Sequence, residues 1–148
     1  MPGAETPPTT AVLDASVAVR WVVPEEGSEQ AAALLARSIS WIAPRLMLTE
    51  VAAALRRKVV DGGLRAELAS QSLDALVRAV AEGTVRLADD EEVVSAALLL
   101  ALTLGHRVPD CVYLALAERE GAGLVTADRR LDELARQRGI ATEFVPSA

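Results

Sequence analysis

Four acidic residues of this 148-residue chain stand beside or inside apolar segments, where their chemistry is unexpected. Asp14 ends one apolar run, and Asp128 closely follows another. Glu50 lies within a third apolar stretch, and Asp110 stands at the head of a fourth. A carboxylate in apolar sequence costs folding free energy unless something compensates for it. Gathered in one place, the four would make a site for a hard divalent cation such as Mg²⁺ or Mn²⁺, which prefers oxygen ligands.

Each acid also has a purely structural interpretation when it is taken alone. Asp128 could cap the helix that follows it, and Asp110 after Pro109 is a common first-turn pattern. Glu50 could be a solvated helix residue. Asp14 is the hardest to dismiss, because Asp is disfavoured beside a buried strand. The four together favour a shared site more strongly than any one of them does.

Strand-like and helical patterns alternate along the chain. The strands are expected over residues 11–14, 40–43, 85–87, 124–126 and 142–145, and the helices over residues 16–23, 28–37, 46–60, 65–82, 91–104, 109–120 and 129–138. This alternation predicts an α/β fold in which about seven helices flank one five-stranded parallel sheet. Residues 1–10, with three prolines, are expected to form a disordered leader, so that residues 11–148 form a single domain.

The predicted sheet gives the acids a common location. In open α/β sheets, ligands bind beyond the carboxyl ends of the strands, where Asp14 and Asp128 are expected. Asp110 is expected in the first turn of a helix, where the helix dipole favours an anion. Glu50 must reach the site from within a helix. Two carboxylates about 4 Å apart repel by roughly 4 kcal/mol at an effective dielectric of about 20, so such a cluster favours a bound cation.

Composition narrows the class of protein. Hydrophobic residues make up 51% of the chain and aromatic residues only 3%, so the core must be aliphatic. The apolar runs are shorter than the ~20 residues that span a membrane, and no membrane segment is expected. The single Cys111 cannot form an internal disulfide, which fits the reducing cytoplasm. The net charge of −6 argues against a general nucleic-acid coat protein but not against an enzyme with an acidic metal site.

Four segments resemble, in order, the acidic motifs of PIN-domain ribonucleases. These segments are Val12–Ser16, Thr49–Leu55, Val108–Ala117 and Val125–Asp128. Their order, spacing and strand or helix context agree over nearly the whole chain, and its size is similar to that of the VapC toxins of bacterial and archaeal toxin–antitoxin pairs. One departure is Leu131, where many relatives carry Phe, and this difference concerns packing more than chemistry.

The resemblance implies Mg²⁺- or Mn²⁺-dependent endonucleolytic cleavage of RNA by a toxin. The catalytic and metal-binding acids would be Asp14, Glu50, Asp110 and Asp128. Ser16 and Thr126 match hydroxyl positions that commonly support that set. The implied partners are an RNA substrate, a second copy of the chain in a homodimer, and a small antitoxin. The C-terminal segment of such an antitoxin lies in the groove and often places an Arg at the acidic site.

Two other functions remain open. One is a catalytically silent domain of the same fold that only binds a partner, which the presence of all four acids disfavours. The other is an aspartate-based phosphotransfer domain. A response-regulator receiver needs a Lys near the end of a late strand, yet the only lysine, Lys58, is expected in mid-helix. A phosphatase with an Asp nucleophile would usually have a second Asp where this chain has Ser16.

Several further polar and aromatic residues are expected to be structural. His106 is the only histidine, so no His-based metal set exists, and a loop or helix-end position is expected for it. Asp132 could be a fifth carboxylate of the site, but a solvated helix residue is the preferred interpretation. Trp21 and Trp41 could stack on bases, but packing in the core or in a dimer is preferred.

Overall fold

The computed structural model of the chain describes residues 9–24 and 28–146. Of the predicted leader, only Thr9 and Thr10 fall within these ranges, and the rest of it lies outside the described residues. Thr10 begins the first strand, one residue before the predicted start.

Five strands and seven α-helices alternate in the described part of the chain. The strands are β1 (Thr10–Leu13), β2 (Ser40–Pro44), β3 (Val85–Ala88), β4 (Gly123–Thr126) and β5 (Thr142–Phe144). The helices are α1 (Ala15–Val22), α2 (Ser28–Leu35), α3 (Leu46–Val60), α4 (Ala66–Ala81), α5 (Val94–Leu104), α6 (Val108–Glu120) and α7 (Arg129–Gln137). The predicted α/β fold is therefore confirmed, with boundaries that differ by a few residues.

The strands form one parallel sheet in the order β3-β2-β1-β4-β5. The chain begins in the centre, moves outward through β2 and β3, and then returns across the sheet to β4 and β5. In register, Val12 of β1 lies opposite Ile42 of β2 on one side and Leu124 of β4 on the other. The direction of strand addition reverses between β1 and β4. Ligands of open parallel sheets bind at such a reversal, beyond the carboxyl ends of the strands.

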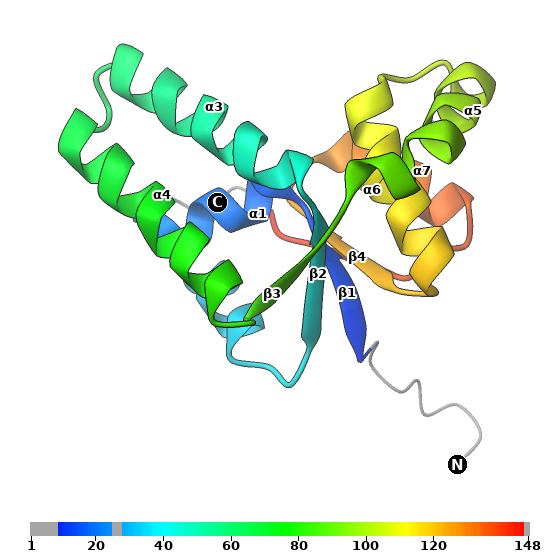
Figure 1. The fold of residues 1–148 in the computed structure, drawn as a ribbon, viewed down its shortest axis with the longest axis horizontal. Helices are drawn as coiled ribbons and strands as arrows, with labels where there is room; N and C mark the ends of the chain where they lie inside the picture. Colours follow the sequence, from blue (N-terminus) through cyan, green and yellow to red (C-terminus); the bar gives the residue numbers. More distant parts are fainter. Residues whose placement is uncertain (1–8, 25–27, 147–148) are drawn as a thin grey trace.

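Helices cover both faces of the sheet, as expected for a parallel sheet. Figure 1 shows the α3–α4 hairpin beside α1 and, across the sheet from them, α5, α6 and α7. Helix α6 lies against β1, β2 and β4, and its residues 110–117 are all buried. The core is mostly aliphatic, and its buried aromatic residues are Trp41 and Tyr113. Trp41 meets Trp21 edge to face at 5.2 Å between ring centroids. The packing interpretation of the two tryptophans is confirmed.

The connection between α5 and α6 determines where the acidic end of α6 lies. Gly105 ends α5 with φ +63°, a left-handed conformation that glycine adopts without a steric penalty. The chain then turns through His106 and Arg107 before α6 begins.

Among the described residues, no single helix is long and apolar enough to cross a membrane. Only α5 and α6 taken together reach that length and composition, and they are bent by 115° relative to each other.

Two boundaries differ from the prediction for a local reason. Strand β1 ends at Leu13 because Asp14 takes the N-cap position of α1, and its carbonyl accepts hydrogen bonds from the N–H groups of Val17 and Ala18. The helix predicted over residues 91–104 is divided into a short 3₁₀ turn, Asp90–Glu92, and helix α5.

Candidate active site

Asp14 and Asp128 follow the two neighbouring strands between which the strand order reverses. The backbone N–H of Asp14 donates to the carbonyl of Val125 at 3.1 Å, which ties the end of β1 to β4. Because β1 is buried, it carries Asp14 into the interior, and only 7% of this residue is exposed. Asp128 comes two residues after the end of β4. Both acids therefore lie beyond the carboxyl ends of the strands, as the sequence predicted.

Two hydroxyl groups fix the Asp14 carboxylate. Ser16 and Thr126 both donate hydrogen bonds to its Oδ2 atom, at 2.5 and 2.8 Å. Each hydroxyl also accepts a backbone N–H at 2.9 Å, from Ala127 for Ser16 and from Asp128 for Thr126. The two hydroxyls thus accept hydrogen bonds from backbone N–H groups and donate their own protons to Asp14. The structure thus brings both predicted supporting residues into contact with the acid.

Burial makes the charge of Asp14 costly. It raises the pKa of the Asp14 carboxyl from 3.8 to about 6, although the hydrogen bonds from Ser16 and Thr126 act to lower it. The negative charges of Glu50 and Asp128 raise this pKa further. A nearby cation would offset both the lost hydration and the repulsion between the acids.

Asp128 is a helix cap as well as a neighbour of Asp14. Its Oδ1 atom accepts hydrogen bonds from the backbone N–H groups of Arg130 and Leu131, at 2.9 and 3.2 Å. These contacts satisfy two of the unpaired donors at the start of α7. No described residue donates a hydrogen bond to the other carboxylate oxygen. The capping interpretation is therefore confirmed, and it leaves Oδ2 available for a ligand.

Glu50 reaches the site from the side of α3. It is partly buried, and the hydroxyl of Tyr113 on α6 donates to its Oε1 atom at 2.5 Å. Burial raises the pKa of the Glu50 carboxyl, the Tyr113 hydrogen bond lowers it, and the charge of Asp110 raises it again. Burial also raises the pKa of Tyr113 well above its usual value, so its hydroxyl keeps the proton that it donates.

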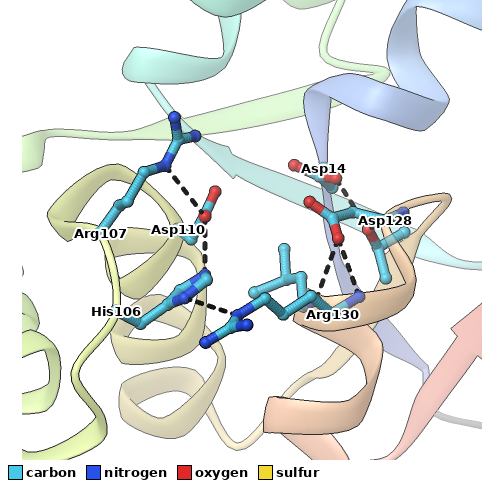
Figure 2. A network of polar contacts seen from close by, with 8 residues as sticks. Asp14, His106, Arg107, Asp110, Asp128 and Arg130 are labelled. Carbon is cyan, nitrogen blue, oxygen red and sulfur yellow. Dashed lines mark hydrogen bonds and ion pairs between the residues drawn. The ribbon is translucent and has the colours of Figure 1, made fainter.

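Asp110 lies in the first turn of α6 and is only 9% exposed. Its Oδ2 atom lies 2.8 Å from Nε2 of His106 and 3.6 Å from Nε of Arg107. Figure 2 shows Asp110 between these two side chains, with Asp14 and Asp128 across from it. The first turn of a helix favours an anion, so α6 and the two basic groups all stabilise the charge of Asp110.

The four acids influence one another without forming a closed ligand cage. The charge of Asp110 acts on Glu50, and the charges of Glu50 and Asp128 act on Asp14. In the part of the chain that the structure describes, no three Asp, Glu, His or Cys side chains lie close enough to hold a metal ion.

The donor set nevertheless fits Mg²⁺ or Mn²⁺. Each of the four carboxylates has at least one oxygen that accepts no hydrogen bond from a described residue: Oδ1 of Asp14, Oε2 of Glu50, both oxygens of Asp110 and Oδ2 of Asp128. Mg²⁺ usually keeps several waters and takes only one or two carboxylates, so it needs no preformed cage. The residues therefore offer hard oxygen donors in a region of excess negative charge.

Sequence reasoning missed the site contacts of Tyr113 and His106, and it misjudged the burial of Asp132 on α7. Tyr113 lies one turn beyond Asp110 in a buried helix, and a hydroxyl in an otherwise aliphatic run was the available signal. His106 was expected in a loop or at a helix end and lies in the connection between α5 and α6, but its contact with Asp110 was not anticipated. Asp132 was expected to be solvated, and this is wrong: it is 8% exposed and pairs with Arg136 at 2.9 Å. That pairing gives Asp132 a partner within α7.

Cationic side chains adjoin the acids. The positive charges of Arg107 and Arg57 lower the pKa of Glu50, opposing its burial. Arg130 lies beyond Asp128, and its Nε donates to Nδ1 of His106 at 3.1 Å. The region therefore combines carboxylates with nearby guanidinium groups, which suit phosphate oxygens.

Sequence comparison identifies relatives of this chain. The family model described as the PIN domain matches residues 11–137. Ribonuclease VapC3 of Pyrobaculum aerophilum is 37% identical to this chain over 122 residues, which cover 82% of this chain and 92% of that protein.

Solved structures share the fold. PAE2754 from Pyrobaculum aerophilum matches with a TM-score of 0.68 and 22% identity, over 90% of this chain and 83% of that one. VapBC2 from Rickettsia felis, solved bound to a DNA fragment from its promoter, matches with a TM-score of 0.61 and 15% identity, over 91% of this chain and 98% of that one. A member of the VapBC family of toxin–antitoxin systems, VapBC-5 from Mycobacterium tuberculosis, matches at 0.51 with 18% identity, over 94% of this chain and 99% of that one. At these identities, the likeness concerns the fold alone.

Proposed function

This chain belongs to the PIN-domain family, and from that premise we propose that it is a metal-dependent endoribonuclease, the toxin of a toxin–antitoxin pair. The observation that carries the proposal is a group of four carboxylates that act on one another electrostatically beside the strand-order reversal. Asp14 is buried at that reversal, and its pKa is raised. Carboxyl groups with shifted pKa values, gathered beyond the carboxyl ends of parallel strands, are typical of catalytic sites. The 37% identity to a ribonuclease supports RNA as the substrate.

In the proposed site, Asp14, Glu50, Asp110 and Asp128 would hold Mg²⁺ or Mn²⁺, one or two of them directly and the others through waters of the ion. When bound, such an ion supplies charge stabilisation at a phosphodiester and a more acidic water. Ser16 and Thr126 keep the Asp14 carboxylate in one orientation, and the hydroxyl of Tyr113 does the same for Glu50.

The guanidinium groups beside the acids supply the second half of the proposed chemistry. Arg107 is 74% exposed and lies next to Asp110, so it can reach a phosphate in solution. Its charge partly offsets that of the acids and lowers the repulsion that an incoming RNA strand would meet. Hydrolysis then adds one water across a phosphorus–oxygen bond of the RNA backbone.

Partners follow from the same family membership. We propose that a small antitoxin binds over the acidic site and that two copies of the chain form a homodimer. The VapBC structures from Rickettsia felis and Mycobacterium tuberculosis share this fold, which supports a toxin–antitoxin assignment. A short reading frame directly upstream that encodes a DNA-binding protein would strengthen that assignment.

The proposal is tested with purified protein and a mixed pool of RNA. We expect cleavage in Mg²⁺ or Mn²⁺ and none in excess chelator, and sequencing of the RNA ends then identifies the cut sites. Asp14→Asn is the matched variant, because it keeps the size of the side chain and removes its charge. We expect it to lower cleavage by about 100- to 1,000-fold, as removal of one charge-stabilising group does in other enzymes, with the fold unchanged.

Two results would contradict the proposal. Full cleavage in excess chelator would exclude the metal mechanism, and normal cleavage by Asp14→Asn would show that the site is assigned wrongly. A folded protein that binds its antitoxin but cleaves no RNA under any metal condition would instead be a catalytically silent binding domain.

A further inference from the structure

His106, the only histidine of the chain, is held between two elements of the proposed site. It lies in the connection between α5 and α6, and its side chain is only 9% exposed. Figure 2 shows its ring between Asp110 of α6 and Arg130 of α7. Neither the proposed chemistry nor the core requires a histidine here, so its position needs its own explanation.

The contact with Arg130 determines which ring nitrogen carries the proton. Nε of Arg130 donates a hydrogen bond to Nδ1 of His106 at 3.1 Å. A nitrogen that accepts a hydrogen bond carries no proton, so this contact assigns the proton of a neutral imidazole to Nε2. The Arg130 guanidinium therefore selects the ring tautomer.

The protonated nitrogen lies against the carboxylate of Asp110. Nε2 is 2.8 Å from Oδ2, although the contact is bent too far to count as a hydrogen bond, and Nε2 is buried with no other partner. At 2.8 Å the Oδ2 atom is within hydrogen-bonding reach of this N–H, and rotation of the imidazole would align the two groups. Leaving such a donor unpaired would cost about 1–3 kcal/mol.

We propose that His106 is a positioning residue for the metal site: it holds Asp110 through Oδ2 and so presents Oδ1 to the cation. This inference rests on the proposed function. The backbone N–H of Arg130 also donates to Oδ1 of Asp128, so one residue of α7 contacts both an acid and the histidine that orients another acid. His106 and Arg130 thereby fix the separation between α6 and α7 at the site.

Arg107 supplies a contrast within the same contact. Its Nε lies 3.6 Å from the same Oδ2 atom, but its side chain is 74% exposed, so it adds charge without fixing the orientation of the carboxylate. If charge alone mattered, Arg107 would be the more important neighbour of Asp110. If orientation matters, His106 is.

The test measures Mn²⁺ affinity by calorimetry and RNA cleavage in parallel. His106→Leu should weaken Mn²⁺ binding by about 10- to 100-fold, the usual cost of losing a group that orients a metal ligand. His106→Gln, which keeps a side-chain N–H near the Nε2 position, should recover much of that loss. Arg130→Gln should weaken binding less than His106→Leu, and Arg129→Gln on the same helix should leave it unchanged.

The outcomes separate this inference from the proposed function. Mn²⁺ binding by His106→Leu at the wild-type affinity would overturn the inference, even if the wild type cleaves RNA. Wild-type binding that depends on His106, without RNA cleavage, would support the inference and contradict the proposed function. Loss of binding on Arg107→Gln but not on His106→Leu would mean that Arg107, not His106, orients Asp110, because removing a positive charge by itself should strengthen Mn²⁺ binding; this result would also overturn the inference. If His106→Leu fails to fold, the Mn²⁺ affinities of His106→Gln and Arg130→Gln decide: wild-type affinity in Arg130→Gln would overturn the inference.

A second readout uses the wild-type chain. Because this is the only histidine, a tag-free ¹⁵N-labelled sample gives one set of imidazole signals. We expect the Nε2–H form, and a shift of the Nε2 resonance on addition of Mg²⁺ that disappears in Asp110→Asn. A proton on Nδ1, or no response to Mg²⁺ in a sample that binds it, would overturn the positioning role.

Discussion

The two halves of the acidic site are held in different ways. Asp14 and Asp128 follow buried strands and are fixed by hydroxyls and backbone N–H groups that belong to the same two strand ends. Glu50 and Asp110 lie on helices. Glu50 is held by Tyr113, which is 63 residues away in sequence, and Asp110 meets His106 of the α5–α6 connection.

The two halves differ in how much folding free energy their buried charges cost. The strand-end carboxylate of Asp14 is buried and its pKa is raised to about 6, so the ionised form opposes folding. Glu50 on α3 is only partly buried, and water can replace a lost partner there. We therefore expect changes at the contacts of Asp14 in the strand half to affect stability more than changes at the contacts of Glu50 in the helix half.

The largest expected effect is the pH dependence that Asp14 imposes on stability. Its pKa is about 6 in the folded protein and 3.8 in the reference state, so the folded protein binds this proton more tightly. The stabilisation is fully present below pH 3.8 and is lost as the pH rises through 6. The free energy of unfolding of the wild type, relative to Asp14→Asn, should therefore fall by about 2–3 kcal/mol between about pH 4 and 7.5.

Urea unfolding of the two proteins across this range measures the difference, and Asp14→Asn serves as the control that cancels all other titrating groups. Adding Mn²⁺ at pH 7.5 should raise the melting temperature of the wild type and not that of Asp14→Asn, because only the folded, charged site binds it. Parallel pH profiles for the two proteins would show that burial of Asp14 does not govern stability.

A pair of conservative variants compares the two halves directly. Thr126→Val keeps the side-chain shape but removes a donor from buried Asp14 and an acceptor from the N–H of Asp128. We expect it to cost about 2–3 kcal/mol of unfolding free energy. Tyr113→Phe removes the donor from partly exposed Glu50 and should cost about 1 kcal/mol.

Chemical denaturation measures both costs, and the pH profile of cleavage adds a check on Glu50. The Tyr113 hydrogen bond lowers the pKa of Glu50, so Tyr113→Phe should move the acidic limb of the profile to higher pH. An equal or larger loss of stability from Tyr113→Phe would remove the distinction between the two halves.

The sequence predicted the strand half because its determinants are local. The buried run Ala11–Leu13 places Asp14, and Ser16 two residues later holds its carboxylate, whereas the hydrogen bond from Thr126 spans 112 residues and was expected only from the resemblance to PIN-domain ribonucleases. The alternation of strands and helices was predictable for the same reason, since each element carries its own hydrophobic period and stop signals.

The helix half depends on packing between distant segments. The contact of Tyr113 with Glu50 requires α6 to lie beside α3, and no periodicity within either helix specifies that. The contact of Arg130 with His106 likewise requires α7 to meet the α5–α6 connection. The burial of Asp132 could not be predicted either, because it depends on which side of α7 packs against the sheet. Its partner Arg136, one turn later on the same helix, could have been predicted.

The smallest expected effect separates the two roles of Asp128. Asn caps helices about as well as Asp, whereas Ala costs about 1 kcal/mol at an N-cap. Asp128→Asn should therefore keep the stability of the wild type, and Asp128→Ala should lower the unfolding free energy by about 1 kcal/mol. Both variants should lose RNA cleavage to a similar degree, because neither retains the carboxylate that the proposed metal site needs.

Denaturation and cleavage assays on the same two proteins give four values, and their pattern is decisive. If Asp128→Asn cleaves RNA as the wild type does while Asp128→Ala is impaired and less stable, Asp128 acts only as a cap for α7. The strand half would then contribute Asp14 alone to the chemistry. Equal loss of cleavage with unequal stability would mean that one carboxylate uses Oδ1 to hold the helix and leaves Oδ2 for the cation.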